Sequence, residues 1–94
     1  MQEVEGRIYD VDKAREGQEK YCEKADVPHF APKTGTCWRC GMNIYEPHGW
    51  KYENRQKIKV ALDQSPEYIT GIDVNEASNG LVTGCPHCNR SYCD

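Results

Sequence analysis

Four cysteines occur as two pairs with two residues between the members of each pair, a spacing typical of a metal site. Cys37 and Cys40 form the first pair, and Cys85 and Cys88 form the second. Two intervening residues permit a tight turn that directs both sulfurs to one point. Four thiolates form the tetrahedral site that zinc prefers, with metal–sulfur distances of about 2.3 Å. The pairs therefore predict one structural metal ion. We favour zinc, with iron as the alternative, because both ions accept four thiolates.

The residues that follow each pair support a metal site independently of the cysteines. The position after the second cysteine often needs a left-handed backbone conformation, which Gly41 adopts without steric cost and Asn89 tolerates better than most residues. The 44 residues between Cys40 and Cys85 far exceed the spacer of simple sites of this kind. We therefore expect this insert to form a hairpin and a short helix of its own.

The two segments resemble the knuckles of a zinc ribbon. They also resemble the rubredoxin pattern, in which Cys-x-x-Cys-Gly is followed by an aromatic residue, here near Tyr45, and later by Cys-Pro-x-Cys. The matching residues are Cys37-Trp38-Arg39-Cys40-Gly41 and Cys85-Pro86-His87-Cys88. The likeness covers roughly a third of the chain, and the whole sequence is similar to small uncharacterised zinc-ribbon proteins of bacteria and their phages. It implies a metal-organised ribbon or, alternatively, a rubredoxin-like Fe(Cys)4 electron carrier, and no further activity.

The other cysteines and the histidines receive a structural interpretation. We expect Cys22 to pack as a small apolar residue. Cys93 is expected to be free, although it is an alternative to Cys88 as a ligand. His29 and His48 are expected in turns, and His87 within the second knuckle with its ring pointing outward. A second metal site made of Cys22, His29 and Cys93 is conceivable but not favoured.

The elements that must position the cysteines follow from periodicity and from turn residues. We expect a single α+β domain over 1–94, in which an N-terminal helix and connector (1–36) pack on a metal-binding ribbon with an enlarged insert (37–94). Apolar residues on one face predict a helix over 11–25, with Gln18 as a polar gap. A strand or loose arm is expected over 1–9, and strands are expected over 42–46, 50–52, 58–62 and 68–72, of which the last pairs with the strand over 58–62. A short helix is expected over 73–79, ending at Gly80.

Composition restricts the setting in which the protein works. The acidic N-terminus has no apolar run, so we expect neither a signal peptide nor a membrane span, and hence a reducing cytoplasm in which paired cysteines hold metal rather than disulfides. The formal charge is −3. This charge gives no general attraction to phosphate backbones.

The expected function is a structural-zinc-stabilised binding module whose partner is a protein. The alternative is nucleic-acid binding through residues 50–59, where Trp50 and Tyr52 lie among basic side chains, Lys51, Arg55, Lys57 and Lys59. We favour a protein partner, because Glu53 and the acidic residues that follow weaken this basic field. No catalytic constellation is present in the sequence and a filled four-thiolate site has no open position, so we expect neither enzymatic activity nor a small-molecule substrate.

Overall fold

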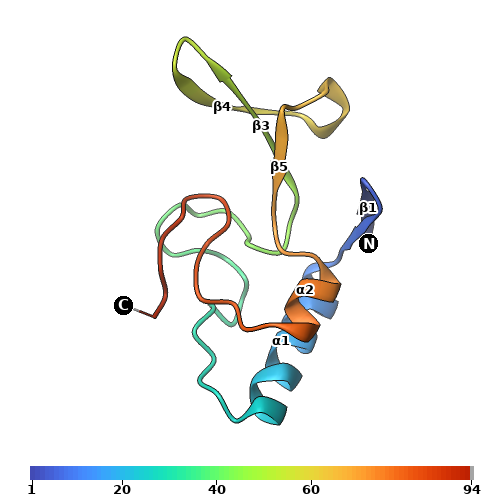
Figure 1. The fold of residues 1–94 in the computed structure, drawn as a ribbon, viewed down its shortest axis with the longest axis vertical. Helices are drawn as coiled ribbons and strands as arrows, with labels where there is room; N and C mark the ends of the chain where they lie inside the picture. Colours follow the sequence, from blue (N-terminus) through green and yellow to red (C-terminus); the bar gives the residue numbers. More distant parts are fainter. Residues whose placement is uncertain (94) are drawn as a thin grey trace.

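The computed structural model describes residues 1–93, and its architecture is α+β, as expected from the sequence. A three-stranded sheet forms one end of the molecule, and two helices lie side by side away from it. The two cysteine segments lie together beside these helices (Figure 1). The elements are β1 (Gln2–Val4), β2 (Arg7–Tyr9), α1 (Val11–Ala25), β3 (His48–Glu53), β4 (Gln56–Val60), a short 3-10 helix (Leu62–Gln64), β5 (Tyr68–Thr70) and α2 (Val74–Asn79).

Helix α1 has the bounds that its apolar periodicity predicts, 11–25. The Asp10 side chain accepts a hydrogen bond from the Lys13 N–H (3.1 Å) and caps the first turn. At the other end Asp26 adopts a left-handed conformation (φ 56°), which ends the helix. Its buried face carries Ala14, Gln18 and Cys22, so the predicted packing of Cys22 is confirmed.

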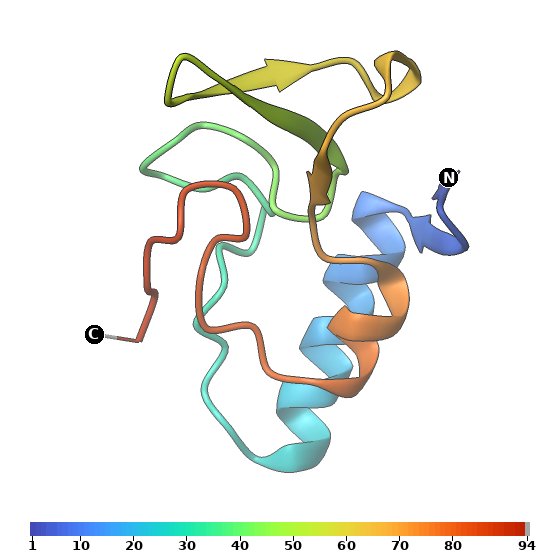
Figure 2. The same cartoon turned by 45° about the horizontal axis from the view of Figure 1, so that its top comes forward.

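A close crossing explains the glycine in the middle of α1. A methyl group at Gly17 would meet the Ser78 hydroxyl and lie 3.3 Å from the Ser78 Cα on α2. Glycine costs about 1 kcal/mol relative to alanine in a helix interior. Here it permits the close approach of α1 and α2 that both views show (Figure 2).

Gln18, the polar gap on the apolar face of α1, is fully buried and hydrogen bonded at both ends of its amide group. Its Nε2 donates to the carbonyl oxygens of Ala77 and Gly80, both at 2.7 Å. Its Oε1 accepts from the Val82 N–H at 2.8 Å. One side chain thus holds the end of α2 and the segment that leads into the second cysteine pair.

Helix α2 and its ends match the prediction of a short helix stopped by glycine. Asp73 accepts a hydrogen bond from the Glu76 N–H at 2.7 Å, which is the first half of a capping box. The helix ends at Asn79, and Gly80 is its C-cap.

The three-stranded sheet differs from the expected hairpin in its pairing. Strand β3 is central, and β4 and β5 pair with it on opposite sides, both antiparallel. Asn54 and Arg55 have positive φ values of 52° and 66°, and their two-residue turn sets the register between β3 and β4. The strand predicted over 58–62 is therefore displaced to 56–60. The strand predicted over 68–72 shortens to β5 and pairs with β3 instead.

The strand predicted over 42–46 is wrong. This stretch forms a turn, with a single bridge between Thr36 and Asn43. The consecutive residues Ile44 and Tyr45 are both buried, which an alternating half-buried strand does not allow. The predicted strand or arm over 1–9 is a hairpin of β1 and β2. No helix among residues 1–93 combines the length and the apolar character needed to cross a membrane.

Candidate metal centre

The first cysteine pair lies in a compact unit, residues 35–44, that closes on itself through backbone hydrogen bonds. The Cys37 N–H donates to the Met42 carbonyl oxygen, and the Gly41 N–H donates to the Cys37 carbonyl oxygen, both at 2.9 Å. The Ile44 N–H donates to the Gly35 carbonyl oxygen at 2.8 Å. Gly41 has a φ of 76°, the left-handed conformation predicted for it.

The second pair lies in a unit, residues 83–92, that repeats this backbone pattern 48 positions later in the sequence. The Cys85 N–H donates to the Arg90 carbonyl oxygen (2.8 Å), and the Asn89 N–H donates to the Cys85 carbonyl oxygen (2.9 Å). The Tyr92 N–H donates to the Thr83 carbonyl oxygen (2.8 Å). Asn89 has a φ of 62°, so asparagine adopts the conformation that glycine has in the first unit. Isolated bridges at equivalent positions, Thr36 with Asn43 and Gly84 with Ser91, complete the correspondence.

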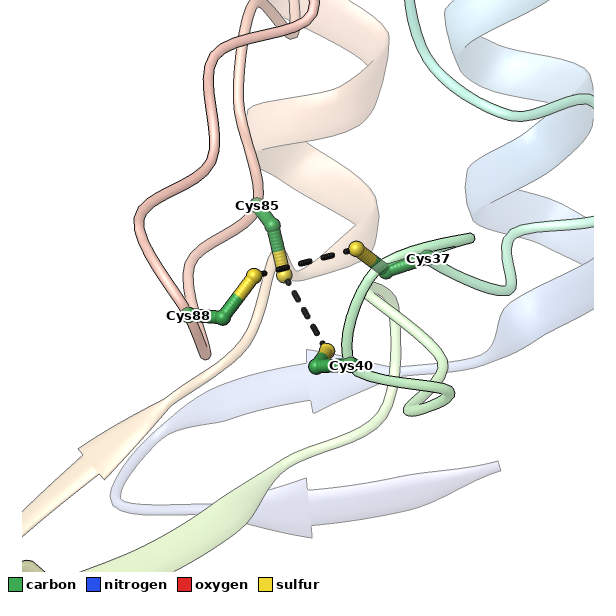
Figure 3. A group of neighbouring side chains, drawn as sticks. All are labelled: Cys37, Cys40, Cys85 and Cys88. Atoms are coloured by element: carbon green, nitrogen blue, oxygen red, sulfur yellow. Dashed lines mark hydrogen bonds between the residues drawn. The ribbon is translucent and has the colours of Figure 1, made fainter.

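The two units bring the four predicted sulfurs together. The Sγ atoms of Cys37 and Cys88 are 3.8 Å apart, as are those of Cys40 and Cys85, and all four lie within 4.8 Å of one another (Figure 3). A tetrahedron with metal–sulfur distances of about 2.3 Å has sulfur–sulfur edges of about 3.8 Å. None of the four cysteines forms a disulfide. The arrangement therefore fits one tetrahedral metal ion.

Hydrogen-bond donors aimed at the sulfurs favour their ionised form. Burial alone would raise the pKa of Cys37, but the adjacent Tyr92 hydroxyl and the N–H groups of Cys40 and Arg39 lower it to about 6. Burial raises the pKa of Cys85 to about 12, opposed by the N–H groups of Cys88 and His87. The thiols must lose their protons to bind a metal, and these donors offset the resulting negative charge.

The orientation predicted for His87 is wrong, because its ring points inward and is buried. Its Nδ1 lies 2.6 Å from the Thr70 Oγ1, and its Nε2 lies 2.8 Å from the Asn43 carbonyl oxygen. The carbonyl can only accept, so Nε2 carries the proton and Nδ1 accepts from Thr70. Burial lowers the pKa of His87 to about 4, so the ring is neutral. This neutral ring connects the second unit to the first and to β5.

Trp50 is also buried, which removes it from the predicted nucleic-acid surface. Its indole N–H donates to the Thr70 Oγ1 at 2.6 Å, and the Lys57 ammonium lies 4.2 Å from its ring centroid. The same ammonium donates to the His87 carbonyl oxygen at 2.9 Å. Lys57 and Thr70, which both contact Trp50, therefore attach the sheet to the second unit through His87.

The remaining cysteines and histidines stay outside the sulfur cluster. Among residues 1–93, the cluster of metal-type ligand atoms consists of the four paired cysteines alone. Cys22 is buried 3.7 Å from Gln18 Oε1, and Cys93 is exposed 3.5 Å from Ser91 Oγ. His29 contacts the Ala31 carbonyl oxygen at 3.0 Å, and His48 packs edge-on against His87. Cys93 thus lies outside the cluster, and Cys88, not Cys93, joins Cys85 there.

Comparisons of the chain with protein-family models, with curated proteins and with solved structures find no match. The function therefore has to be inferred from the site itself. The four cysteines could supply all four ligands of one tetrahedral metal ion.

Proposed function

We propose that this chain is a small binding module stabilised by one structural metal ion, zinc in preference to iron, in a zinc-ribbon type of site. The single observation that carries the proposal is the cluster of four sulfurs, whose separations suit one tetrahedral ion. Cys37, Cys40, Cys85 and Cys88 would hold the ion. Bound there, the ion would link two chain segments and supply folding free energy rather than Lewis-acid chemistry.

Measurement of metal content tests this proposal directly. We expect about one equivalent of zinc per chain in protein purified under reducing conditions, and Cys93→Ser should retain it because Cys93 lies outside the cluster. An iron centre would be red when oxidised, whereas a zinc centre is colourless. Purified protein with no bound metal, and with its cysteines paired in disulfides, would contradict the proposal.

The surface that we propose for a protein partner consists of Trp38, Arg39 and Arg90, which we call the knuckle face. Trp38 belongs to the first unit and is 66% exposed, and the Arg90 guanidinium of the second unit lies 5.1 Å from its ring centroid. Neither arginine forms an ion pair with a carboxylate among residues 1–93. Tryptophan and arginine are enriched among the residues that dominate binding energy at protein interfaces. Because the face spans both units, the metal would assemble it.

A second candidate function is nucleic-acid binding by the sheet, favoured by one observation. Tyr52, within the predicted basic segment 50–59, is exposed and stacked on Tyr68 with ring centroids 6.1 Å apart. Three observations count against nucleic-acid binding: Trp50 is buried, the Lys57 ammonium lies against the Trp50 ring, and the net charge of the protein is negative. Four thiolates and one divalent ion would change the formal charge from −3 to −5. We therefore place a protein partner first.

Affinity capture from the native cell distinguishes the two candidates. We expect the metal-loaded protein to retain a protein partner, Trp38→Ala to lose it, and Tyr52→Ala to keep it. Both side chains are exposed, so neither truncation should affect folding much. In parallel, fluorescence anisotropy should show only weak oligonucleotide binding that disappears near physiological salt. Submicromolar oligonucleotide binding at physiological salt, lost in Tyr52→Ala, would reverse the ranking.

A further inference from the structure

Tyr92 carries a buried hydroxyl that lies near the Cys37 sulfur but makes no hydrogen bond of good geometry to any group among residues 1–93. Its backbone N–H is fixed to the Thr83 carbonyl oxygen at 2.8 Å, and its ring packs against the core cluster that contains Cys37 and Cys85. An unpartnered buried hydroxyl costs about 1–3 kcal/mol, so its presence requires an explanation.

The repeat of the two units shows what is unusual about this hydroxyl. The residue of the first unit that corresponds to Tyr92 is Ile44, whose N–H makes the equivalent hydrogen bond to Gly35. The backbone donors near the sulfurs also correspond. In the first unit the N–H groups of Arg39 and Cys40 face the Cys37 sulfur. In the second unit the N–H groups of His87 and Cys88 face the Cys85 sulfur. The hydroxyl of Tyr92 is therefore an additional donor that the repeated backbone does not supply. Its neighbours include the sulfur atoms of Cys37 and Cys85.

We propose that, in the metal-loaded protein, the Tyr92 hydroxyl donates a hydrogen bond to the Cys37 sulfur and strengthens metal binding; this inference rests on the proposed metal site. Four thiolates and one divalent ion carry a net charge of −2 in a half-buried site, and a thiolate is a much better acceptor than a thiol. Loading the metal would thus provide the partner that the hydroxyl lacks. Tyr92 would act as a positioning residue, through the ligand that it contacts.

The test compares Tyr92→Phe with Tyr45→Phe, because Tyr45 also has a buried hydroxyl without a partner. The Tyr45 hydroxyl lies near Cys22 and Arg15 instead of the cluster. Each full-length variant is titrated with Co2+ under reducing conditions in competition with a chelator. We expect Tyr92→Phe to bind Co2+ about tenfold more weakly. Its sulfur-to-cobalt charge-transfer band should also move to longer wavelength, because a sulfur without a donor releases its electrons more readily. Tyr45→Phe should leave both readouts unchanged.

Equal behaviour of the two variants would overturn the role of Tyr92 and leave the metal site intact. Failure of the wild type to bind Co2+ would overturn the metal site and the role of Tyr92 together. A second measurement does not depend on a variant. In wild-type protein loaded with an NMR-active cadmium isotope, the Tyr92 hydroxyl proton should exchange slowly and show scalar coupling to the metal through the Cys37 sulfur. Absence of that coupling would also overturn the proposal.

Discussion

Cys88→Ser is expected to lose the metal and most of its tertiary structure. Cys88 contributes one of four clustered sulfurs, which come from two units far apart in the sequence and which the proposed metal ion would link. A structural zinc ion supplies on the order of 10 kcal/mol to a small domain, which is comparable with the whole stability of most domains. Metal analysis should show a large loss of bound zinc. Circular dichroism and thermal unfolding should show a weak or absent cooperative transition, and a chelator should have the same effect on the wild type.

Two other cysteine variants are the matched controls for this prediction. Cys93→Ser should leave metal content and melting temperature unchanged, because its side chain is exposed and outside the cluster. Cys22→Ser should retain the metal and lose only about 1–2 kcal/mol, the usual effect of placing a hydroxyl in an apolar site. If Cys22→Ser lost the metal as completely as Cys88→Ser, the assignment of the four ligands would be wrong.

Gln18→Leu is expected to lose about 3–5 kcal/mol of unfolding free energy although it replaces a polar side chain with an apolar one of similar size. The substitution leaves the carbonyl groups of Ala77 and Gly80 and the N–H of Val82 without partners in the interior. Each unsatisfied buried group costs about 1–3 kcal/mol, and such costs are not fully additive. Urea unfolding of the metal-loaded protein measures the loss.

Lys20→Leu provides the comparison, since Lys20 lies on the exposed side of the same helix. It should change stability by less than about 0.5 kcal/mol. A loss below about 1 kcal/mol for Gln18→Leu would mean that the three hydrogen bonds contribute little. In that case the end of α2 and the entry to the second unit would be held by packing alone.

The parts of the fold that could be predicted from the sequence depend on local interactions. Helix α1 follows from apolar periodicity, with Asp10 and Asp26 at its ends. The capping of α2 by Asp73 follows from its three-residue spacing to Glu76. The repeated Cys-x-x-Cys spacing and the residues at 41 and 89 predict both turns that carry the sulfurs. These features involve neighbours along the chain, so residue type and spacing were sufficient.

The features that could not be predicted depend on contacts between distant segments. In the sequence, Gln18 indicates only a polar interruption of an apolar face. Its hydrogen bonds to residues 77–82 depend on the position of α2 beside α1, which the sequence pattern does not give. Likewise, His87 points inward because Thr70 and Asn43 offer it partners, and neither is near it in sequence. Strand β5 pairs with β3 instead of β4. The alternation of apolar and polar residues predicts that a segment is a strand, but it does not determine which neighbouring strand it pairs with. Tyr92 carried no sequence pattern beyond its position after the second pair.

The repeated ten-residue units have a consequence for the time course of folding. The first unit can close through its own backbone bonds, but it offers only two of the four thiolates. Synthesis must continue through the whole insert to residue 92 before the second unit can supply the rest. Closing a chain loop of this length has an entropic cost that only the completed site recovers, which makes such contacts slow to form. The nascent chain would therefore expose the two thiols of the first unit while the insert is being synthesised, and capture of the metal by all four thiolates would follow synthesis of the second unit.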